Sequence, residues 1–555
     1  MYPRLSTILS YMRQSDDYSA SHPVCVIIRL TKDGVLRMNG ADLIVETAIR
    51  AGIKVCFANP GTTEMPIVLA LDSRPGIKPI LGLFEGVCTG AADGYGRMLE
   101  KPAMTLLHLG PGFANGIANL HNARRAHTPL VSVIGQHATW HRSADPPLAM
   151  DIGSLAGTVS GWQRTNRTPK ALSRDMVDAI DASMYGQIST LIVPNNYQLR
   201  ACDGVNIVSP QFKFEPVEST RIEASAQLLR TNRKTAIILG GRALRRRGLT
   251  ATARIKAVAG CDVLSSTFPA YVERGNGLLN VPRIPYFPEG GIEMLSGYQA
   301  VVLAGTKEPV TFFGYEGVRG RLLTENQPRA ELATDKQDIV DALDSLAEAL
   351  NAPKSSKIIS EHRATKGNAP DLPTGELTPD KLCLTLAALQ PEGAIIIDEG
   401  LTTSFSYYQV SADSAPHSFI TIAGGSIGYG MPCAVGAAIA CPERPVINIQ
   451  ADGSAMYTLQ ALWTEARLGL NIVTLICSNK IYNILKVELM RAGLKSLGPA
   501  TSSLIEFDRP EINWVKLAEG MGVPAVSVDT AEALAREFCK ALSEPGPHLV
   551  SMILV

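Results

Sequence analysis

The chain lacks any excess of charge of one sign. Its 555 residues include 52 lysines and arginines and 52 aspartates and glutamates, so the formal net charge is zero. A protein without a net positive field has no global electrostatic attraction for nucleic acid or for an anionic membrane surface. We therefore expect neither a nucleic-acid partner nor a membrane partner.

The sequence also lacks long apolar runs and paired cysteines. No segment approaches the roughly 20 apolar residues that cross a bilayer, and the richest one, MPCAVGAAIAC (431–441), is interrupted by Pro432. The 10 cysteines are scattered through apolar segments without a CxxC pair. This pattern favours buried thiols in a reducing compartment over disulfides or a zinc site. We expect a soluble, cytoplasmic protein.

The length and composition are typical of a multidomain globular protein. Apolar residues make up 46% of the chain and charged residues 19%, and the length exceeds that of a single hydrophobic core. Alternating strand and helix patterns predict an α/β fold with doubly wound parallel sheets. The expected segments are a weakly ordered extension over 1–37, domains over 38–205, 206–350 and 379–555, and a polar linker over 351–378; the alternative for the extension is a natural start at Met38.

Two predicted strands of the last domain end in polar residues. Asp452 and Gly453 end PVINIQADG, and Asn479 ends NIVTLICSN. Carboxyl ends of neighbouring parallel strands meet at one sheet edge, so these side chains should converge. Their oxygens suit Mg²⁺, with phosphate and water completing the coordination, and the helix opened by Ser454 presents N–H groups to an anion. The alternative for this segment alone is an ordinary βαβ unit.

Glu85 stands at the end of another apolar stretch, PILGLFEG (79–86), which we predict to be a strand. The helix that follows, GVCTGAADGYGR, is rich in small residues and can pack closely. An apolar setting disfavours a charged carboxylate, so a proton-sharing acid that hydrogen-bonds a ring nitrogen is expected. The alternative is a carboxylate that interacts with the helix N-terminus.

Together these segments resemble thiamine-diphosphate-dependent enzymes of the pyruvate decarboxylase type. The Asp-Gly and Asn spacing is similar to the thiamine-diphosphate motif, and the E-G-x-x-x-x-A-A-D-G-Y pattern is shared with acetolactate synthase large subunits and benzoylformate decarboxylase. The resemblance implies a pyrimidine-binding first domain, a central domain and a diphosphate-binding last domain. It also implies that Glu85 binds N1′ of the aminopyrimidine and thereby favours the imino tautomer that activates the cofactor.

The resemblance also implies the substrate-facing residues. NPGTTEM (59–65) is similar to the N-P-G-S-x-E loop of benzoylformate decarboxylase, which places Pro60 at the cofactor and the Thr62 hydroxyl over the reacting carbon. The alternative for Thr62 is a helix N-cap near Glu64. His108, in LLHLGPG, matches a segment with an active-site histidine and would exchange substrate protons. Taken alone, His108 would be a structural residue.

The same resemblance implies that three further loops contact the cofactor. GPGFANG (110–116) has the wrong spacing for a dinucleotide loop and is interpreted as the family's G-P-G-x-x-N turn. DEGLTTS (398–404) offers hydroxyls to the diphosphate, and AGGSIGYGMP (423–432) contains the residue that bends the cofactor. The predicted cofactor-binding residues are Pro60, Glu85, Asn115, Thr402, Thr403, Ile427, Asp452, Gly453, Ser454, Asn479 and Ile481. The predicted metal ligands are Asp452, Asn479 and the Ile481 carbonyl.

The sequence departs from the family pattern at two substrate positions. Glu488 stands where acetolactate synthases have an acceptor-selecting Trp, and a carboxylate facing an anionic oxo acid would repel it. Gly314 stands where benzoylformate decarboxylase has a second His, so slow protonation and carboligation become alternatives to simple decarboxylation.

We predict a thiamine-diphosphate- and Mg²⁺-dependent enzyme that cleaves or forms the carbon–carbon bond next to a carbonyl. Its substrate would be a 2-oxo acid or an aldehyde, and the family implies a homodimer or homotetramer. Alternatives are a lyase of the oxalyl-CoA decarboxylase kind, a non-catalytic binding subunit and a nicotinamide-dependent dehydrogenase. For GGRALRRRG (240–248), a solvated basic turn is favoured over a site for FAD or for the ADP part of coenzyme A, because such turns are more frequent.

Overall fold

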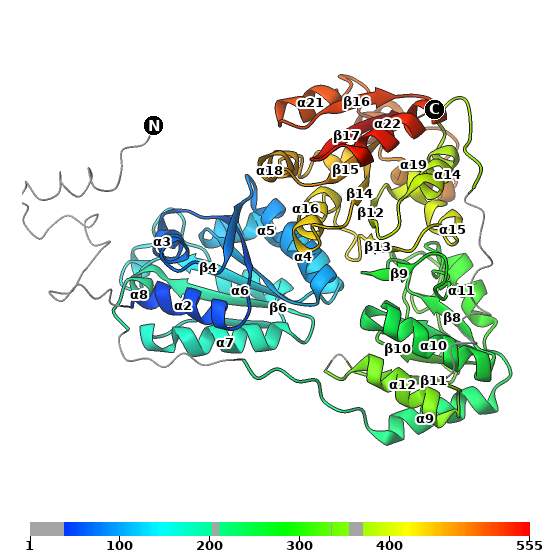
Figure 1. Cartoon of the computed structure of the whole chain (residues 1–555), viewed down its shortest axis with the longest axis horizontal. Helices are drawn as coiled ribbons and strands as arrows, with labels where there is room; N and C mark the ends of the chain where they lie inside the picture. The colour runs from blue at the N-terminus through cyan, green and yellow to red at the C-terminus, as the bar shows by residue number, and fades with distance from the viewer. Residues whose placement is uncertain (1–37, 203–209, 335, 355–369, 555) are drawn as a thin grey trace, which may run out of the picture.

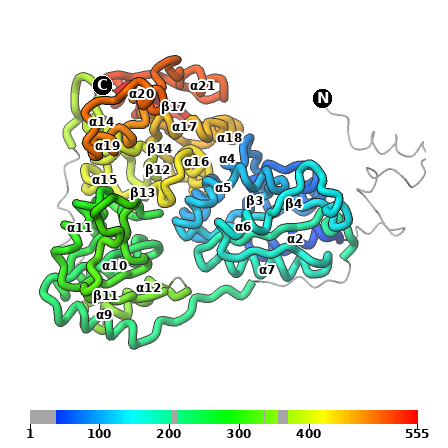
Figure 2. The backbone as a smooth tube through the Cα atoms, turned by 180° about the vertical axis from the view of Figure 1, so that it is seen from behind, coloured from blue at the N-terminus to red at the C-terminus, as the bar shows by residue number. Residues whose placement is uncertain are grey.

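The computed structural model describes residues 38–202, 210–334, 336–354 and 370–554. The predicted extension over 1–37 and most of the predicted linker lie outside the described residues. Within these ranges the chain forms three sheets flanked by helices, which Figures 1 and 2 show from opposite sides. The predicted α/β fold with three parallel-dominated sheets is confirmed. None of the helices in these ranges combines the length and apolarity needed to cross a bilayer.

The first unit contains a six-stranded parallel sheet in the order β2-β1-β3-β4-β6-β5. Its inner strands are apolar and buried because helices cover both faces. The strands are β1 (Val55–Asn59), β2 (Lys78–Leu81), β3 (Ala103–Leu107), β4 (Leu130–Gln136), β5 (Trp162–Thr165) and β6 (Ile188–Pro194). The helices are α2 (Gly40–Arg50), η1 (Thr62–Glu64), α3 (Met65–Ser73), α4 (Glu85–Leu99), α5 (Leu109–Arg125), η2 (Arg142–Ala144), α6 (Ile152–Val159), η3 (Pro169–Ala171), α7 (Leu172–Ser183) and α8 (Asn195–Gln198).

The central unit contains a four-stranded parallel sheet in the order β11-β10-β7-β8. The strands are β7 (Thr235–Leu239), β8 (Asp262–Ser265), β10 (Ala300–Ala304) and β11 (Arg329–Ala333). The helices are α9 (Ser219–Thr231), η4 (Gly241–Leu244), α10 (Arg246–Ala259), α11 (Pro288–Ser296) and α12 (Ile339–Ala349).

The third unit contains a seven-stranded sheet in the order β16-β17-β15-β14-β12-β13-β9. The strands supplied by this unit are β12 (Ile395–Glu399), β13 (His417–Thr421), β14 (Val446–Ala451), β15 (Ile472–Ser478), β16 (Ala525–Val528) and β17 (His548–Ile553). The helices are α14 (Pro379–Leu389), η5 (Leu401–Ser404), α15 (Tyr407–Val410), α16 (Gly430–Ala440), α17 (Asp452–Ala455), α18 (Ala461–Leu468), α19 (Asn483–Arg491), α20 (Pro499–Ile505), α21 (Trp514–Gly520) and α22 (Ala531–Ser543).

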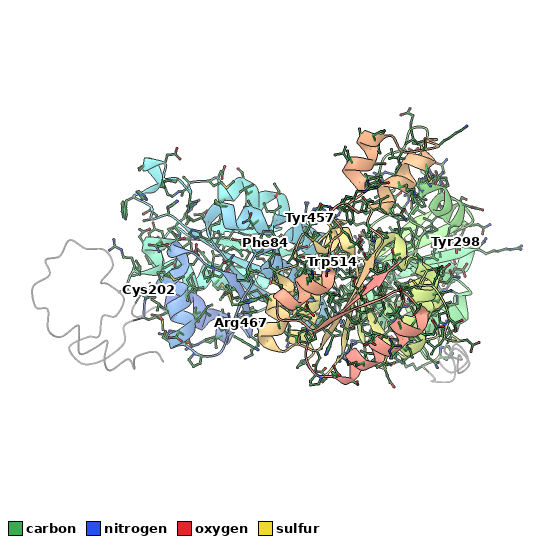
Figure 3. The ribbon with its side chains drawn as sticks, turned by 90° about the horizontal axis from the view of Figure 1, so that it is seen from above. Phe84, Cys202, Tyr298, Tyr457, Arg467 and Trp514 are labelled. Atoms are coloured by element: carbon green, nitrogen blue, oxygen red, sulfur yellow. The ribbon has the colours of Figure 1, made fainter. Side chains whose placement is uncertain are left out.

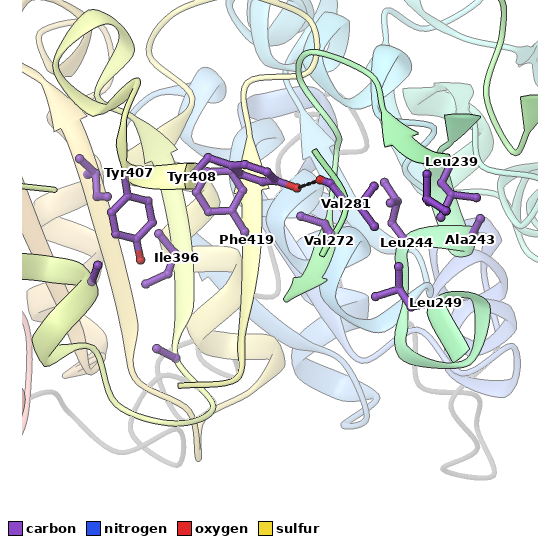
Figure 4. Close-up of a cluster of buried hydrophobic side chains, with 14 of the residues drawn as sticks. Leu239, Ala243, Leu244, Leu249, Val272, Val281, Ile396, Tyr407, Tyr408 and Phe419 are labelled. Atoms are coloured by element: carbon purple, nitrogen blue, oxygen red, sulfur yellow. Dashed lines mark hydrogen bonds between the residues drawn. The ribbon is translucent and has the colours of Figure 1, made fainter. Parts of the chain in front are cut away.

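The seventh strand, β9 (Val272–Arg274), comes from the range assigned to the central unit. It pairs antiparallel with β13, whereas the other strands of this sheet run parallel. Nearby, the Tyr408 hydroxyl donates a hydrogen bond of 2.8 Å to the Val281 carbonyl (Figure 4). One apolar cluster therefore extends from the central sheet into the third one.

Helices α4 and α16 join the first and third units (Figure 1). Their contact surfaces consist of small residues: a Cβ on Gly436 would collide with the Ala91 carbonyl. At the same contact, Arg97 pairs with Asp93 at 2.6 Å and donates a hydrogen bond of 2.7 Å to the Thr421 carbonyl. A shared apolar cluster includes Trp514 of the third unit, and Phe84 of the first unit packs against this cluster (Figure 3).

Candidate active site

Two loops of the first unit meet where the strand order reverses, at the carboxyl ends of β1 and β3. Such a reversal is the usual ligand-binding position in an open α/β sheet. Pro60 follows β1, and His108 follows β3 as the N-cap residue of α5. His108 Nδ1 lies 2.7 Å from Glu64 Oε2, and the Thr63 hydroxyl donates a hydrogen bond of 2.5 Å to Glu64 Oε1.

Glu64 orients His108. The Glu64 side chain is fully buried, whereas that of His108 is 24% exposed. A carboxylate partner selects the tautomer with its proton on Nδ1, which leaves Nε2 as a proton acceptor. The predicted alternative for Thr62 is not observed, because Gly61 holds the N-cap position of η1 and Thr62 is exposed. Glu64 was not predicted as a site residue, although it belongs to the NPGTTEM loop.

Glu85 begins a helix, so the prediction that it ends a strand is wrong. Strand β2 ends at Leu81, and Phe84 is the N-cap residue of α4. The apolar residues after Leu81 continue the strand pattern in sequence, but in the structure they form the turn into α4. Glu85 is 8% exposed, and its Oε2 atom accepts a hydrogen bond of 3.0 Å from Asn115 Nδ2. Two predicted cofactor residues on neighbouring helices are thus in contact.

A cleft in the third unit gathers most of the other predicted residues. Strands β14 and β15 are parallel neighbours, so Asp452 and Asn479 reach the same sheet edge. Thr402 and Ile427 also line the cleft, whereas Thr403 is buried beside it. The lining residues are Gly400, Leu401, Thr402, Ile427, Ala451, Asp452, Gly453, Ser454, Asn479, Ile481, Tyr482, Asn483 and Ile484.

Asp452 carries the carboxylate of this cleft. It is 2% exposed, and burial raises the pKa of its carboxyl group to about 6. Two backbone hydrogen bonds oppose that rise: Lys480 N–H donates to Oδ2 at 2.7 Å and Gly453 N–H donates to Oδ1 at 2.8 Å. A cation next to the carboxylate would stabilise its charged form further. A Cβ at Gly453 would collide with the Tyr482 ring, so any larger residue there would require that ring to move.

The oxygen atoms near Asp452 fit Mg²⁺. Asn479 Oδ1 accepts a hydrogen bond of 3.1 Å from Ile481 N–H, and the Ile481 carbonyl accepts one of 2.9 Å from Asn483 N–H. One carboxylate, one amide and one carbonyl form an oxygen-only donor set of the kind Mg²⁺ prefers. Among the described residues, no group of three or more His, Cys, Asp or Glu side chains could hold a metal ion.

Glu399, which was not predicted as a site residue, holds the loop that carries Ile427. Its side chain is fully buried, and burial raises the pKa of its carboxyl group. Oε1 accepts a hydrogen bond of 2.7 Å from Gly428 N–H, and Oε2 accepts one of 2.9 Å from Tyr429 N–H. These donors belong to the residues that lead into α16, so Glu399 fixes the approach of the Ile427 loop to that helix.

The first unit supports the same loop. Asn119 Nδ2 donates a hydrogen bond of 2.9 Å to the Gly86 carbonyl and one of 3.2 Å to the Gly428 carbonyl. Asn122 Nδ2 donates a hydrogen bond of 2.7 Å to the Ser426 carbonyl. The backbone next to Glu85 is therefore connected to the Ile427 loop through one asparagine.

A cavity of about 380 Å³ lies between the first and central units, near the carboxyl ends of β7, β10 and β11. Arg242 and Arg245, from the basic turn after β7, line it. Both pair with Glu100, at 3.1 and 3.2 Å, and Arg242 also pairs with Asp338 at 3.1 Å. Because these guanidinium groups already have carboxylate partners, a phosphate would have to compete for them.

The Glu488 carboxylate contacts two neighbouring side chains. Its Oε1 atom accepts a hydrogen bond of 3.0 Å from the Tyr315 hydroxyl, and Oε2 lies 3.7 Å from Arg491 Nε. Arg491 in turn donates to both carboxylate oxygens of Glu289 at 3.0 Å. These contacts hold α19 against the central unit. They also place the positive charge of Arg491 near the Glu488 carboxylate, which was expected to repel an oxo acid.

Comparisons with known proteins cover most of the chain. Residues 38–156 match the family described as "Thiamine pyrophosphate enzyme, N-terminal TPP binding domain", and residues 400–552 match its "C-terminal TPP binding domain". A Mycobacterium tuberculosis protein named as an acetolactate synthase large subunit (IlvX) is 44% identical over 524 residues, which are 93% of this chain and 99% of that protein.

A more distant relative and a solved structure also match nearly the whole chain. Benzoylformate decarboxylase from Pseudomonas aeruginosa is 26% identical over 538 residues, which are 91% of this chain and 96% of that protein. Among solved structures, a thiamine diphosphate-dependent 4-hydroxybenzoylformate decarboxylase from Rhodococcus jostii RHA1 has a TM-score of 0.80 at 22% identity. The match covers 93% of this chain and 99% of that one.

Proposed function

The chain belongs to the thiamine pyrophosphate enzyme family, and we propose that it uses thiamine diphosphate and Mg²⁺ to cleave or form the carbon–carbon bond next to a carbonyl. The proposed reactions are decarboxylation of a 2-oxo acid and carboligation onto an aldehyde. The observation that carries the proposal is the convergence of Asp452 and Asn479 in one cleft, together with a buried Glu85 on α4.

The third unit would hold the diphosphate and the metal. Asp452, Asn479 and the Ile481 carbonyl would bind Mg²⁺, and the Thr402 hydroxyl with the N–H groups around Gly453 would face the diphosphate. When bound, thiamine diphosphate supplies a carbon nucleophile and accepts the electron pair released from the substrate. Ile427 would support the bent form of the cofactor, because Glu399 fixes its loop.

Glu85 would bind the aminopyrimidine. A buried carboxyl group held by one amide donor can share a proton with a ring nitrogen. Asn115 donates to Oε2 and thereby orients the carboxyl group. The proton held between Glu85 and the ring would keep the pyrimidine in the tautomer that the reaction requires.

His108 would move the substrate proton. Its Nδ1 proton is held by Glu64, so Nε2 can accept a proton and return it. The exposed Thr62 hydroxyl lies on the neighbouring turn and would orient the carboxylate of the substrate. All these groups lie at the carboxyl ends of β1 and β3.

We further propose a homodimer as the smallest active form, with a homotetramer as an extension of it. The Asp452 cleft encloses only about 20 Å³ in a single chain, and no residue of the first unit's described range lines it. Apolar side chains are exposed on both units, with Leu83 46% and Tyr457 52% exposed. A second chain would cover these surfaces and complete the cofactor site. Sedimentation velocity would show a dimer or tetramer, and a monomer with full activity would refute this arrangement.

The proposed function is tested by calorimetric titration of the metal-stripped protein with thiamine diphosphate. Binding should require Mg²⁺ and should be lost in Asp452→Ala, because that variant lacks the carboxylate ligand. The wild-type holoenzyme should turn over a 2-oxo acid, and Glu85→Gln should lose that turnover. Full activity of Glu85→Gln would exclude the mechanism, and cofactor binding without any turnover would favour a non-catalytic binding subunit.

The alternative of a resident nucleotide is less well supported. FAD or the ADP part of coenzyme A would need the cavity near β7, where Arg242 and Arg245 already pair with carboxylates. The absorption spectrum of the purified protein tests FAD directly. A lyase of the oxalyl-CoA decarboxylase kind would bind ADP in the same calorimeter.

A further inference from the structure

A second cavity, of about 260 Å³, lies between the central and third units. It opens at the carboxyl ends of β8, β12 and β13 and shares Leu401 with the Asp452 cleft. Phe312 of the central unit packs against Gly425 of the Ile427 loop, where a Cβ would collide with its ring. The cavity therefore adjoins the proposed cofactor cleft on the side of the central unit.

Four aromatic side chains form part of the cavity wall. Phe268, Tyr286, Phe287 and Phe405 line it. The ring centroids of Phe268 and Tyr286 are 5.9 Å apart, and those of Tyr286 and Phe287 are 5.0 Å apart. Small-molecule sites range upward from about 300 Å³ and are lined mainly by apolar side chains with a few polar groups. The size and walls of this cavity suit one planar ring.

Arg283 supplies a cation at the cavity wall. Its guanidinium lies 4.3 Å from the centroid of the Tyr408 ring, and the Tyr408 hydroxyl is fixed by the Val281 carbonyl (Figure 4). Burial lowers the pKa of Arg283 from its usual value. Arg283 also lines the cavity.

Asp398 supplies the opposite charge. Its Oδ1 atom accepts a hydrogen bond of 2.5 Å from the Ser404 hydroxyl and one of 3.2 Å from Gly400 N–H. The charge of Arg283 lowers the pKa of Asp398, against a larger rise caused by burial. The two side chains thus affect one another electrostatically, yet no direct ion pair joins them among the described residues.

We propose that this cavity binds the distal end of the substrate, and that Arg283 and Asp398 select a hydroxyl group there. The inference rests on the proposed function for the reaction itself. Arg283 and Asp398 together give the cavity no net charge. A carboxylate on the distal end of a substrate would therefore lie beside Asp398 without a second cation to compensate its charge. A hydroxyl accepts a hydrogen bond from Arg283 and donates one to Asp398. The preferred substrate is a 2-oxo acid or aldehyde whose ring carries a hydroxyl opposite the reacting carbon.

The test compares matched substrates that differ only in the ring hydroxyl. The full-length holoenzyme is assayed with phenylglyoxylate and 4-hydroxyphenylglyoxylate, and kcat/KM should be roughly 10- to 100-fold higher for the hydroxylated compound, as expected for a hydrogen bond to charged groups. Arg283→Met should bring that ratio close to one by slowing only the hydroxylated substrate. Equal values in the wild type, or an equal loss for both substrates in Arg283→Met, would overturn the inference.

Two further variants control the comparison. Arg509→Met removes an arginine that is 91% exposed and should leave the ratio unchanged. Asp398→Asn removes the acceptor charge and should also lower the ratio, so the inference stays testable if Arg283→Met does not fold. A wild-type ratio that survives in Asp398→Asn and in Arg283→Met counts against it.

A binding experiment separates this inference from the proposed reaction. If no 2-oxo acid is turned over, the proposed function fails, and calorimetry with 4-hydroxybenzaldehyde and benzaldehyde still tests the cavity. The hydroxylated aldehyde should bind roughly tenfold more tightly, and Arg283→Met should remove the difference. Equal affinities for the wild type would refute the cavity assignment, whatever the reaction.

Discussion

Replacing Glu465 by glutamine should stabilise the protein, and the gain should grow as the pH rises. Glu465 lies on α18, is 0% exposed, and neither of its carboxyl oxygens has a hydrogen-bond partner among the described residues. Burial raises the pKa of this carboxyl group well above its usual value of 4.5. The folded protein therefore keeps a proton that the unfolded chain releases.

The sign and size of the effect follow from that proton. Because the pKa is higher in the folded state, the wild type is most stable below the unfolded-state pKa and loses about 1.4 kcal/mol per pH unit until the pH passes the folded-state pKa. Glutamine has a similar size and stays neutral. The difference in the free energy of unfolding between Glu465→Gln and the wild type should therefore rise by up to about 2.7 kcal/mol from pH 5 to pH 7.

Urea unfolding of both proteins at pH 5, 6 and 7 measures this difference. The raised pKa values of Asp452 and Glu399 occur in both proteins, so they cancel in the subtraction. Glu519→Gln, which changes an exposed glutamate of α21, is the matched control and should show no dependence on pH. A difference that stays flat from pH 5 to pH 7 would refute the reasoning from burial.

Three other variants test the site and its supports. Glu64→Gln should lower kcat roughly 10- to 100-fold and change the pH profile, because His108 loses the carboxylate that sets its tautomer; titration should find cofactor affinity unchanged, and an unaltered pH profile would count against this role. Gly436→Ala should lower the stability by about 1–3 kcal/mol, because the added methyl group overpacks the α4–α16 contact; thermal unfolding measures this loss. In the control Gly520→Ala, the added Cβ has no atom within 4 Å, so the loss should be far smaller. Glu399→Gln should weaken thiamine diphosphate binding in calorimetry, since one neutral amide oxygen replaces a carboxylate that accepts several backbone N–H groups; unchanged affinity would contradict that support.

The strands that carry the cofactor residues could be predicted from the sequence, because each one is a short run of neighbouring apolar residues. The apolar run before Asp452 and the one before Asn479 correspond to β14 and β15, and parallel pairing brings their ends together. The family resemblance is also confirmed, because residues 38–156 and 400–552 match the two domains of the family. A helix was correctly predicted over the residues that follow Glu85, but it already begins at Glu85. The end of β2 was also predicted wrongly, because apolar residues continue past its last residue, Leu81.

The parts that were missed depend on contacts between distant segments. Glu64 acquires its role from His108, which follows a different strand. Thr402 and Thr403 are adjacent on η5, and composition cannot show that the first lines the cleft while the second is buried. Strand β9 is three residues long and pairs with β13 from the other side of the predicted linker. No local pattern predicts such a pairing.

Strand β9 also determines how this protein can be recombined with its relatives. A crossover in the polar stretch between the central and third units would not exchange a complete structural unit. It would instead combine β9 of one parent with β13 of another and divide the apolar cluster that continues through Tyr408 and Val281. The segment from Val272 to the end of the third unit should therefore come from a single parent. In a chimera, the junction should lie before Val272.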